Sequence, residues 1–362
     1  MRPLSKSSTF FFFTLFLFIG ITLLNLQVPR HPDYSKIKRS VFCEQARNRN
    51  ASNDRKYLFF PMVTIVADGG LGNQLFEVFS LLGMARTLNR TAVFNDDDYT
   101  LHSNLRFLRS KLPRVAQKVV SIPIEIPEAT RHVASPACCH FDIPSILKCE
   151  QSKFLLVDGV YFQSFKYFSS IESEIRNLLK PSEEKTVELK RLVIGKDEPR
   201  FKTCVHIRRG DFVTDGIHAG TDQKFTLDAI KYLRTLRQTP LPDSVFTANF
   251  PDSGPVFLFS NDPDWVLTQI VDHLENSDDV RTMKTPKSEA LNDLYFSQVH
   301  CDSVLITAPS STFGWWMGYL SKNASNVFYR DIRQLHDAVK LQMVDEDFFP
   351  PQWKKLKIPQ SA

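Results

Sequence analysis

The sequence lacks the signatures of several common protein classes. Its cysteines are few and show no zinc-binding spacing. The glycine-containing segment 68–73 has neither the Gly-Lys-Ser/Thr ending of a nucleotide P-loop nor the full G-x-G-x-x-G pattern of a dinucleotide site. No internal repeat is evident. These absences argue against a zinc-finger, a P-loop nucleotidase and a repeat protein.

The chain also lacks a basic surface of the kind that binds nucleic acid. Its net charge is +5, but residues 1–56 carry ten Lys/Arg against three Asp/Glu. This leaves +7 in that segment and −2 in the remaining 306 residues. Because the positive charge is confined to the N-terminus, we set aside a nucleic-acid-binding function. The 43% hydrophobic and 23% charged content is that of a globular protein.

One apolar run stands near the N-terminus, from Thr9 to Leu24 and extendable to Val28. Its length approaches the roughly 20 residues that span a bilayer. A cleaved signal peptide is the alternative, but no small-x-small cleavage site follows the run. We predict a cytoplasmic tail (1–8), a signal-anchor transmembrane helix (9–28) and a basic stem (29–56), although positive charges flank both ends of the run.

Two features favour a lumenal location for the rest of the chain. Sequons for N-glycosylation begin at Asn50, Asn89 and Asn323. The six cysteines are even in number, as expected in an oxidising compartment. We expect Cys138 or Cys139 to pair with Cys149 within one loop, and both Cys204 and Cys301 to be buried free thiols.

Strands and helices alternate beyond the stem. A strand at Met62–Ala67, the glycine loop 68–73 and an amphipathic helix from Gln74 to Leu88 are typical of half a βαβ unit. The pattern predicts strands at 154–157, 203–207, 256–260 and 304–307, and helices at 172–179, 183–194, 225–236, 288–300 and 310–320. Such alternation predicts parallel sheets in α/β layers, with the charged stretch 180–202 as the boundary between two lobes.

The segment His206–Asp211 dominates the functional interpretation. It continues a short strand into a glycine turn, so alternation places Cys204, His206 and Arg208 on one face. Two adjacent guanidiniums at the carboxyl end of a strand suit a bidentate grip on phosphate oxygens. A surface arginine pair bridged to acidic neighbours is the alternative for such a sequence.

Other polar segments have both a functional and a structural interpretation. Ser310-Ser311-Thr312 opens a helix, which makes either an anion site or an ordinary N-cap. Asp262-Pro263-Asp264 is either a metal-binding pair or a helix N-cap, and we favour the N-cap. Asp293 is either a guanine-reading carboxylate or a helical surface acid, and Trp315-Trp316 is more typical of packing than of ligand stacking.

Together these segments resemble one enzyme family. Gly70–Gln74, His206–Asp211 and Ser310–Trp316, in this order, are similar to segments of the α-1,2-fucosyltransferases. Those are type II Golgi membrane enzymes that transfer fucose from GDP-fucose to a terminal galactose. Phe259–Asp262 and the closing Phe348–Trp353 also resemble family segments, so the likeness spans about residues 62–353. The acceptor-facing region 95–165 resembles nothing assignable.

The resemblance implies an α/β, GT-B-like fold with two Rossmann-like lobes. An acceptor lobe would cover 57–195 and a GDP-fucose lobe 196–353. It also implies inversion at the anomeric carbon without an essential metal or cofactor. The residues that it implies around the donor are Arg208 on the diphosphate, Arg209 assisting or holding the strand end, Ser311 and Thr312 on phosphate oxygens, Asp293 on guanine, His206 in the donor pocket or in a structural role, and Gly72 and Asn73 near the fucose and acceptor.

The general base stays open at this point, with Asp211 favoured by position over Asp68. Three alternative functions also remain. They are a fucosyltransferase with another acceptor, a metal-dependent glycosyltransferase that uses Asp262 and Asp264, and an inactive relative that binds glycans or GDP-sugars.

Overall fold

The computed structural model describes residues 55–193, 195–198, 200–238, 254–274, 279–283 and 289–358. The predicted membrane anchor, most of the stem, Cys43 and the Asn50 sequon lie outside the described residues. Within the described ranges, no helix has the length and apolar character needed to cross a bilayer. Residues 55–148 and 152–358 belong to one compact unit.

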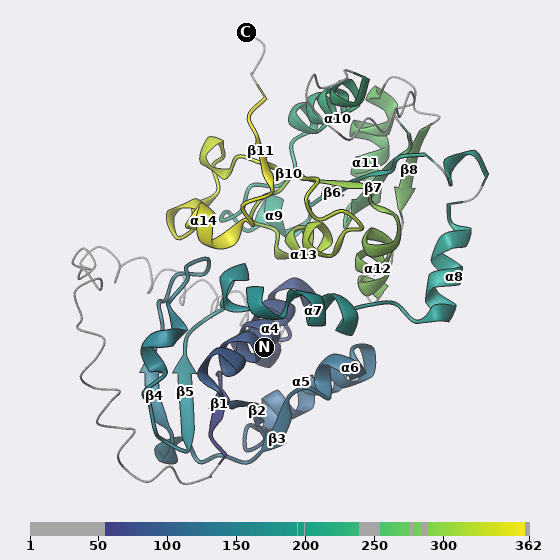
Figure 1. Ribbon diagram of the computed structural model, residues 1–362. Coiled ribbons are helices and arrows are strands. Elements are labelled where there is room, and N and C mark those ends of the chain that lie inside the picture. The colour runs from purple at the N-terminus through teal and green to yellow at the C-terminus, as the bar shows by residue number, and fades with distance from the viewer. Residues whose placement is uncertain are drawn as a thin grey trace, which may run out of the picture. The chain divides into compact units, whose positions relative to one another are not determined.

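The first half of this unit is built on a five-stranded parallel sheet of order β3-β2-β1-β5-β4 (Figure 1). Its strands are β1 (Tyr57–Phe59), β2 (Thr91–Asn95), β3 (Val120–Ile122), β4 (Thr130–Val133) and β5 (Phe154–Asp158). Its helices are α3 (Val63–Val66), α4 (Leu71–Leu88), α5 (Tyr99–Lys111), α6 (Pro113–Ala116) and α7 (Glu172–Leu178).

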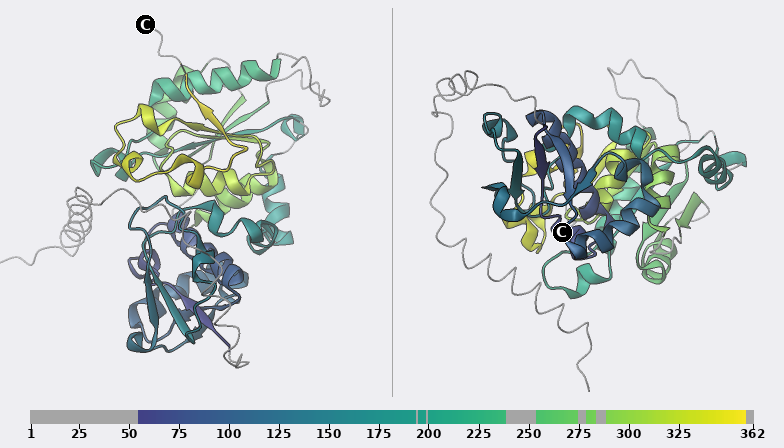
Figure 2. Two further views of the ribbon diagram at one scale, coloured as in Figure 1. Left: turned by 60° about the vertical axis from the view of Figure 1, so that its left-hand side comes forward. Right: turned by 90° about the horizontal axis from the view of Figure 1, so that it is seen from below.

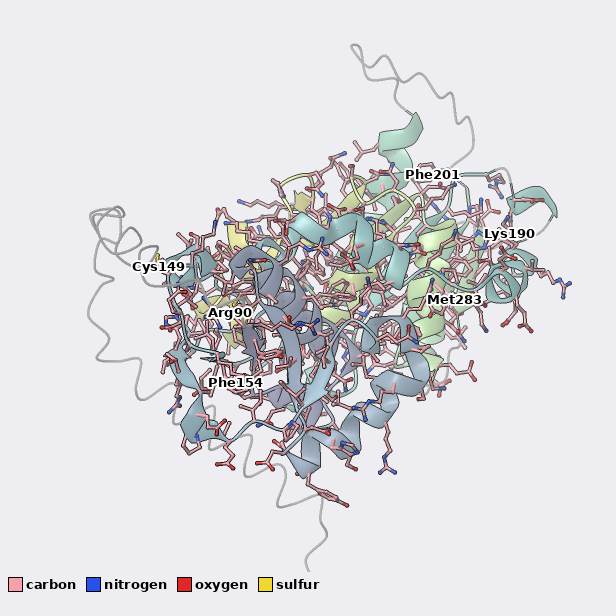
Figure 3. All side chains as sticks on the ribbon, turned by 60° about the horizontal axis from the view of Figure 1, so that its bottom comes forward. Arg90, Cys149, Phe154, Lys190, Phe201 and Met283 are labelled. Carbon is pink, nitrogen blue, oxygen red and sulfur yellow. A yellow bond between two sulfur atoms is a disulfide. The ribbon has the colours of Figure 1, made fainter. Side chains whose placement is uncertain are left out.

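Two interactions tie the central strands of this sheet together. Arg90, labelled in Figure 3, donates from Nη1 to the carbonyls of Tyr57 and Ser152, at 3.1 and 2.9 Å. The rings of Tyr57 and Phe154 stack with their centroids 5.4 Å apart, which joins β1 to β5. These interactions therefore hold β1 and β5 together at their N-terminal ends. The loops that follow the strands lie at the opposite, carboxyl ends.

The predicted strand at Met62–Ala67 is wrong. Strand β1 ends at Phe59, and the apolar residues that follow form the helical turn α3. Pro61 has no N–H to continue a sheet ladder, and Met62 adopts a left-handed backbone with φ 52°. The predicted helix from Gln74 also begins earlier, at Leu71, so Gly72 and Asn73 lie in its first turn.

The second half is built on a six-stranded parallel sheet of order β11-β10-β9-β6-β7-β8. Its strands are β6 (Thr203–Ile207), β7 (Val256–Ser260), β8 (Val280–Met283), β9 (Ser303–Ile306), β10 (Val327–Arg330) and β11 (Lys354–Leu356). The helices are α8 (Glu183–Arg191), α9 (Asp211–Thr214), α10 (Gln223–Gln238), α11 (Pro263–Gln269), α12 (Leu291–His300), α13 (Thr312–Leu320) and α14 (Asp345–Phe348).

Helices cover both faces of this second sheet, and the sequence alternation of β6 decides what each face contacts (Figure 2). Val205 and Ile207 belong to the core cluster that includes Ile230 of α10. Cys204 belongs to the cluster that includes Trp315 of α13. The predicted division of β6 into two faces is thus confirmed, and it directs His206 towards α13.

Helices α4 and α13 pack against each other and join the two sheets through an aromatic core. Phe76 of α4 contacts the rings of Trp315 and Trp316, with centroids 4.6 and 5.2 Å apart. Trp315 also donates its indole N–H to the carbonyl of Phe348, at 2.7 Å. Both tryptophans are fully buried, which confirms their interpretation as packing residues.

The cysteine pairing differs from the prediction in two respects. Cys138 is bonded to its neighbour Cys139 rather than to Cys149. Cys204 and Cys301 are not free thiols but form a disulfide that joins β6 to the end of α12. The parallel pairing of β6 with β9 brings the two chain segments together, although 97 residues separate them in sequence.

Candidate active site at the carboxyl ends of the second sheet

The candidate site lies where the strand order of the second sheet reverses. From β6 the chain moves outward to β7 and β8, then returns to β9 on the other side of β6 and moves outward to β10 and β11. In open α/β sheets, ligands bind outside the carboxyl ends of the strands at such a switch point. Here the two flanking loops begin with Arg208 after β6 and with Thr307 after β9.

Arg208 is held in place with part of its guanidinium uncommitted. One Nη donates to Asp211 Oδ2 at 2.7 Å, and the guanidinium carbon lies 5.1 Å from the centre of the Phe212 ring. Nε is buried and has no hydrogen-bond partner among the described residues. A buried donor without a partner is uncommon in folded proteins, and it suits a ligand oxygen in the site.

Arg209 is more firmly engaged by the protein. Its backbone N–H donates to Asn261 Oδ1 at 2.9 Å, and Nη1 donates to the carbonyl of Thr221 at 2.9 Å. The guanidinium carbon also lies 4.3 Å from the centre of the Trp265 ring. These contacts favour the second of its two expected roles, which is to hold the strand end, although its buried Nε, like that of Arg208, has no hydrogen-bond partner among the described residues.

Two buried threonines connect the loops on either side of the switch point. Thr221 Oγ1 accepts the backbone N–H of Arg208 at 2.9 Å and lies 2.7 Å from Thr307 Oγ1. Thr307 Oγ1 in turn donates to the carbonyl of His206, at 2.7 Å. This network fixes the backbone on which Arg208 sits, and no sequence motif pointed to either threonine.

The N-terminus of α13 faces the same switch point. Ser311 is its N-cap, and its Oγ accepts the N–H of Gly314 at 3.4 Å, which confirms the predicted cap. The N–H groups of Thr312 and Phe313 have no hydrogen-bond partner within the described part of the chain. A helix start with two uncommitted N–H groups attracts an anion, through these donors and through the helix dipole.

Asp337 is a buried carboxylate that organises this helix start. Its Oδ2 accepts Ser310 Oγ at 2.6 Å and the N–H of Ala219 at 3.0 Å, and its Oδ1 accepts the N–H of Val339 at 2.9 Å. It thereby joins the loop after β9 to the loop after α9. Sequence reasoning missed Asp337, because it lies in an irregular segment far from every motif.

His206 is a buried residue that packs against helix α13. Burial, and secondarily the charge of Arg208, lower the pKa of His206 to about 3, so the ring is neutral. A Cβ on Gly314 would lie 2.5 Å from the ring atom Nδ1. The imidazole therefore packs directly beneath α13, which fits the structural alternative for His206.

Gly72 lies against α13 from the other sheet. A Cβ on Gly72 would lie 2.7 Å from the nitrogen of Phe313 and from the carbonyl carbon of Thr312. Its carbonyl accepts the indole N–H of Trp316, at 2.9 Å. The structure thus brings the glycine segment and the Ser-Thr-Phe-Gly-Trp-Trp segment into contact, as their joint presence in one site requires.

The structure also gives the positions of the other residues that the sequence suggested, which are Asn73, Asp262, Asp293 and Asp68. Asn73 Oδ1 accepts Gln163 Nε2, from the loop after β5, at 3.0 Å. Asp262 caps α11 by accepting the N–H of Trp265, which confirms the structural interpretation of the 262–264 segment. Asp293 lies in the first turn of α12, and its contact with guanine stays a prediction. Asp68 is exposed.

Glu77 is a second buried carboxylate that the sequence did not single out. It is 1% exposed, and both of its oxygens accept the N–H of Thr64, at 3.0 and 3.2 Å. Oε2 also accepts Thr64 Oγ1 at 2.5 Å. Burial outweighs these hydrogen bonds and raises the pKa of Glu77 from 4.5 to about 7. This carboxylate caps the turn that replaces the predicted strand.

The raised pKa of Glu77 gives a pH-dependent stability. Between pH 4.5 and 7, Glu77 holds a proton in the folded protein that it releases in the unfolded chain. The contribution of this proton to the unfolding free energy is therefore full below pH 4.5 and is lost as the pH rises through 7. The difference in unfolding free energy, wild type minus Glu77→Gln, should fall by up to about 3 kcal/mol from pH 4.5 to 8. Urea unfolding at several pH values measures it, and a pH-independent difference would contradict this account.

The described residues contain no group of three or more His, Cys, Asp or Glu arranged to hold a metal ion. The polar groups at the switch point are a cationic side chain and backbone N–H donors, a combination that suits an anionic ligand.

Comparisons with known proteins agree with this geometry. The chain is 53% identical over 353 residues to a galactoside 2-alpha-L-fucosyltransferase of Caenorhabditis elegans, covering 98% of this chain and 94% of the relative. It is 35% identical over 331 residues to a second protein of that name from the same organism, covering 87% and 81%.

The comparison with solved structures gives a weaker likeness. The fucosyltransferase NodZ from Bradyrhizobium aligns at 15% identity with a TM-score of 0.41, covering 73% of this chain and 93% of NodZ. A likeness at that level carries no argument about the site. The sequence shows the family instead, because residues 40–357 match the model of one glycosyltransferase family. With that match and the two relatives, the chain belongs to glycosyl transferase family 11.

Proposed function

We propose that this protein transfers L-fucose from GDP-fucose to the 2-hydroxyl of a terminal galactose, with inversion at the anomeric carbon. The observation that carries the proposal is that Arg208 and the N-terminus of α13 both lie at the switch point of the second sheet. The names of the two relatives from Caenorhabditis elegans support the transfer of L-fucose to the 2-position of a galactoside.

The proposal assigns the chain a GT-B-like arrangement of two Rossmann-like lobes. Residues 57–195 form the acceptor lobe and 196–353 the donor lobe. The two parallel sheets support this assignment, because each has its own reversal of strand order, between β1 and β5 and between β6 and β9. A donor at the second reversal then meets an acceptor near the first.

The donor diphosphate lies against Arg208 and the helix start in this scheme. As the bond from the anomeric carbon to the phosphate oxygen breaks, negative charge grows on the departing GDP. Arg208 and the N–H groups of Thr312 and Phe313 stabilise that charge without rearranging, which is the dominant kind of catalytic effect in such sites. They do what a divalent cation does in metal-dependent transferases, so no metal is required.

The reaction is further assigned to the Golgi lumen. The apolar run 9–28 anchors the enzyme as a single-pass type II protein, with residues 29–56 as the stem. Asn89 and Asn323 are both exposed, as glycosylated asparagines must be, and Asn50 is a third candidate in the stem.

The test is an activity assay on the full-length protein in detergent. It uses GDP-fucose, competing GDP- and UDP-sugars, and galactose-terminated glycans, with and without EDTA. We expect transfer from GDP-fucose alone, unchanged by EDTA. Transfer abolished by EDTA would favour a metal-dependent mechanism, and tight GDP-fucose binding without transfer to any glycan would favour a binding protein.

A further inference from the structure

A histidine–aspartate pair lies beside the candidate site and has no part in the functions derived above. Asp215 Oδ2 is 2.6 Å from His218 Nδ1, while Asp215 Oδ1 accepts the N–H groups of Ile217 and His218, at 2.8 and 2.9 Å. The imidazole stacks on Phe212, with ring centroids 4.1 Å apart and an interplanar angle of 11°. Both side chains of the pair are partly exposed, at 20% and 25%.

The loop that carries this pair is fixed between the two loops of the donor site. On one side, the N–H of Thr221 donates to the carbonyl of Arg208, at 2.8 Å. On the other side, Ala219 and Ser310 share the buried oxygen Asp337 Oδ2. The N–H of Ala338 also donates to the carbonyl of Ile217, at 2.8 Å. His218 is thus held on the rim between Arg208 and the start of α13.

The hydrogen bonding leaves one ring nitrogen available for a reaction. With Nδ1 bound to the carboxylate, the neutral ring carries its lone pair on Nε2. No partner for Nε2 is recorded among the described residues. Burial alone would raise the pKa of Asp215. Hydrogen bonds from the N–H groups of His218 and Ile217 and from the His218 ring outweigh burial and hold this pKa below its usual range. The ionised carboxylate stabilises a positive imidazolium.

The other candidates for a base are less suitable. Asp211 is engaged by Arg208, and its ion pair would have to break before it accepted a proton. Glu77 is 1% exposed and fully engaged by Thr64. His206 is buried beneath α13. Around the His218 pair, the charged groups that face it are Arg208, through the shared Phe212 ring, and Asp337 from the adjoining loop.

We propose that His218, oriented by Asp215, is the general base that activates the acceptor hydroxyl. This inference rests on the proposed function. The hydroxyl oxygen of the acceptor forms its bond to the anomeric carbon as the bond to the diphosphate oxygen breaks. The electron pair leaves with GDP, and the hydroxyl proton passes to His218 Nε2. Asp215 is a positioning residue that fixes the tautomer and stabilises the imidazolium.

Two substitutions in the full-length protein test this role. His218→Gln should lower kcat for transfer by about 10²–10⁴-fold, while the Kd for GDP changes by less than about threefold. The wild-type kcat should fall on the acid side as the base is protonated, and the variant should lack this limb. Asp215→Asn should lower kcat less than His218→Gln does, because the imidazole remains but is no longer oriented by a carboxylate.

A control and a rescue experiment separate the base from a merely structural residue. His273→Gln changes an exposed histidine in the 3-10 turn Val271–His273 that follows α11, and should leave kcat and its pH profile unchanged. Added imidazole should restore part of the activity of His218→Ala. The proposal is overturned if His218→Gln keeps kcat within about threefold of wild type, or if it loses GDP binding while the acid limb persists.

The outcome for the wild type keeps the two proposals apart. Wild-type transfer of fucose with an unaffected His218→Gln variant would overturn the assignment of the base alone. Absence of fucose transfer by the wild type, with GDP still bound, would overturn the proposed function and the base together.

Discussion

Replacing Arg208 by alanine should lower kcat for fucosyl transfer by about 10²–10³-fold, the usual cost of removing one donor that stabilises developing charge. The substitution removes the guanidinium whose buried Nε has no hydrogen-bond partner among the described residues. It should leave the fold intact, because the one ion pair that is lost, with Asp211, is largely exposed and contributes at most about 1 kcal/mol. Steady-state kinetics and a thermal unfolding curve measure the two effects.

Arg208→Lys and a surface control sharpen the result. Lysine keeps the charge but not the planar fork, so the variant should fall between wild type and Arg208→Ala. Lys185, on α8, also forms an i,i+3 ion pair with an acid, Glu188. Lys185→Ala should therefore change stability as little as Arg208→Ala does and leave kcat unchanged. Near-wild-type activity in Arg208→Ala would remove the basis of the assigned donor site.

The second large effect is expected at Gly72. Alanine there places a Cβ 2.7 Å from the Phe313 nitrogen and the Thr312 carbonyl carbon, which are backbone atoms and cannot rotate away. We expect a loss of about 2–3 kcal/mol in unfolding free energy, and a drop in kcat because the start of α13 is displaced. Denaturant unfolding and kinetics on the same preparation measure both.

Gly70 provides a matched control two residues away. Apart from its two chain neighbours, no atom of the described residues lies within 4 Å of a Cβ built on Gly70, and its backbone, with φ −59° and ψ 145°, is accessible to alanine. Gly70→Ala should therefore change the unfolding free energy by less than about 1 kcal/mol and leave kcat unchanged. Equal effects of the two substitutions would show that the glycine segment acts through loop flexibility rather than through contact with α13.

The second sheet was largely predictable from sequence because its strands have simple local signals. The segment 203–207 alternates in a way that fixed its two faces, and 256–260 is a continuous apolar run bounded by a proline and an Asn-Asp turn. The capping residues Ser311 and Asp262 were predictable for the same reason, since an N-cap is a local interaction between a side chain and the next turn.

Most of the failed predictions concern interactions between segments that are remote in the sequence, the bond between the neighbours Cys138 and Cys139 being the exception. The apolar run 62–67 has the composition of a strand, but Pro61 and the carboxylate of Glu77 turn it into a helical segment. The Cys204–Cys301 disulfide depends on the pairing of β6 with β9, which no local pattern encodes. The junction at Asp337 likewise joins three loops that have no common motif.

The aromatic core between the two sheets shows why the sequence alone does not predict the shape of the site. Trp315 and Trp316 belong to α13, yet they pack on Phe76 of α4 and on the closing segment at Phe348. The shape of the site thus depends on segments that are remote in the chain. The irregular segment 95–165 in the first half carries no comparable motif.

The most direct test of the central claim is the linkage of the product. The full-length protein is incubated with GDP-fucose and a galactose-terminated glycan, and the product is analysed by methylation analysis and NMR. The account predicts fucose in α linkage on the 2-hydroxyl of galactose, the inverted product of a β-linked donor. Fucose on any other hydroxyl, or no fucosylated product despite bound GDP-fucose, would contradict it.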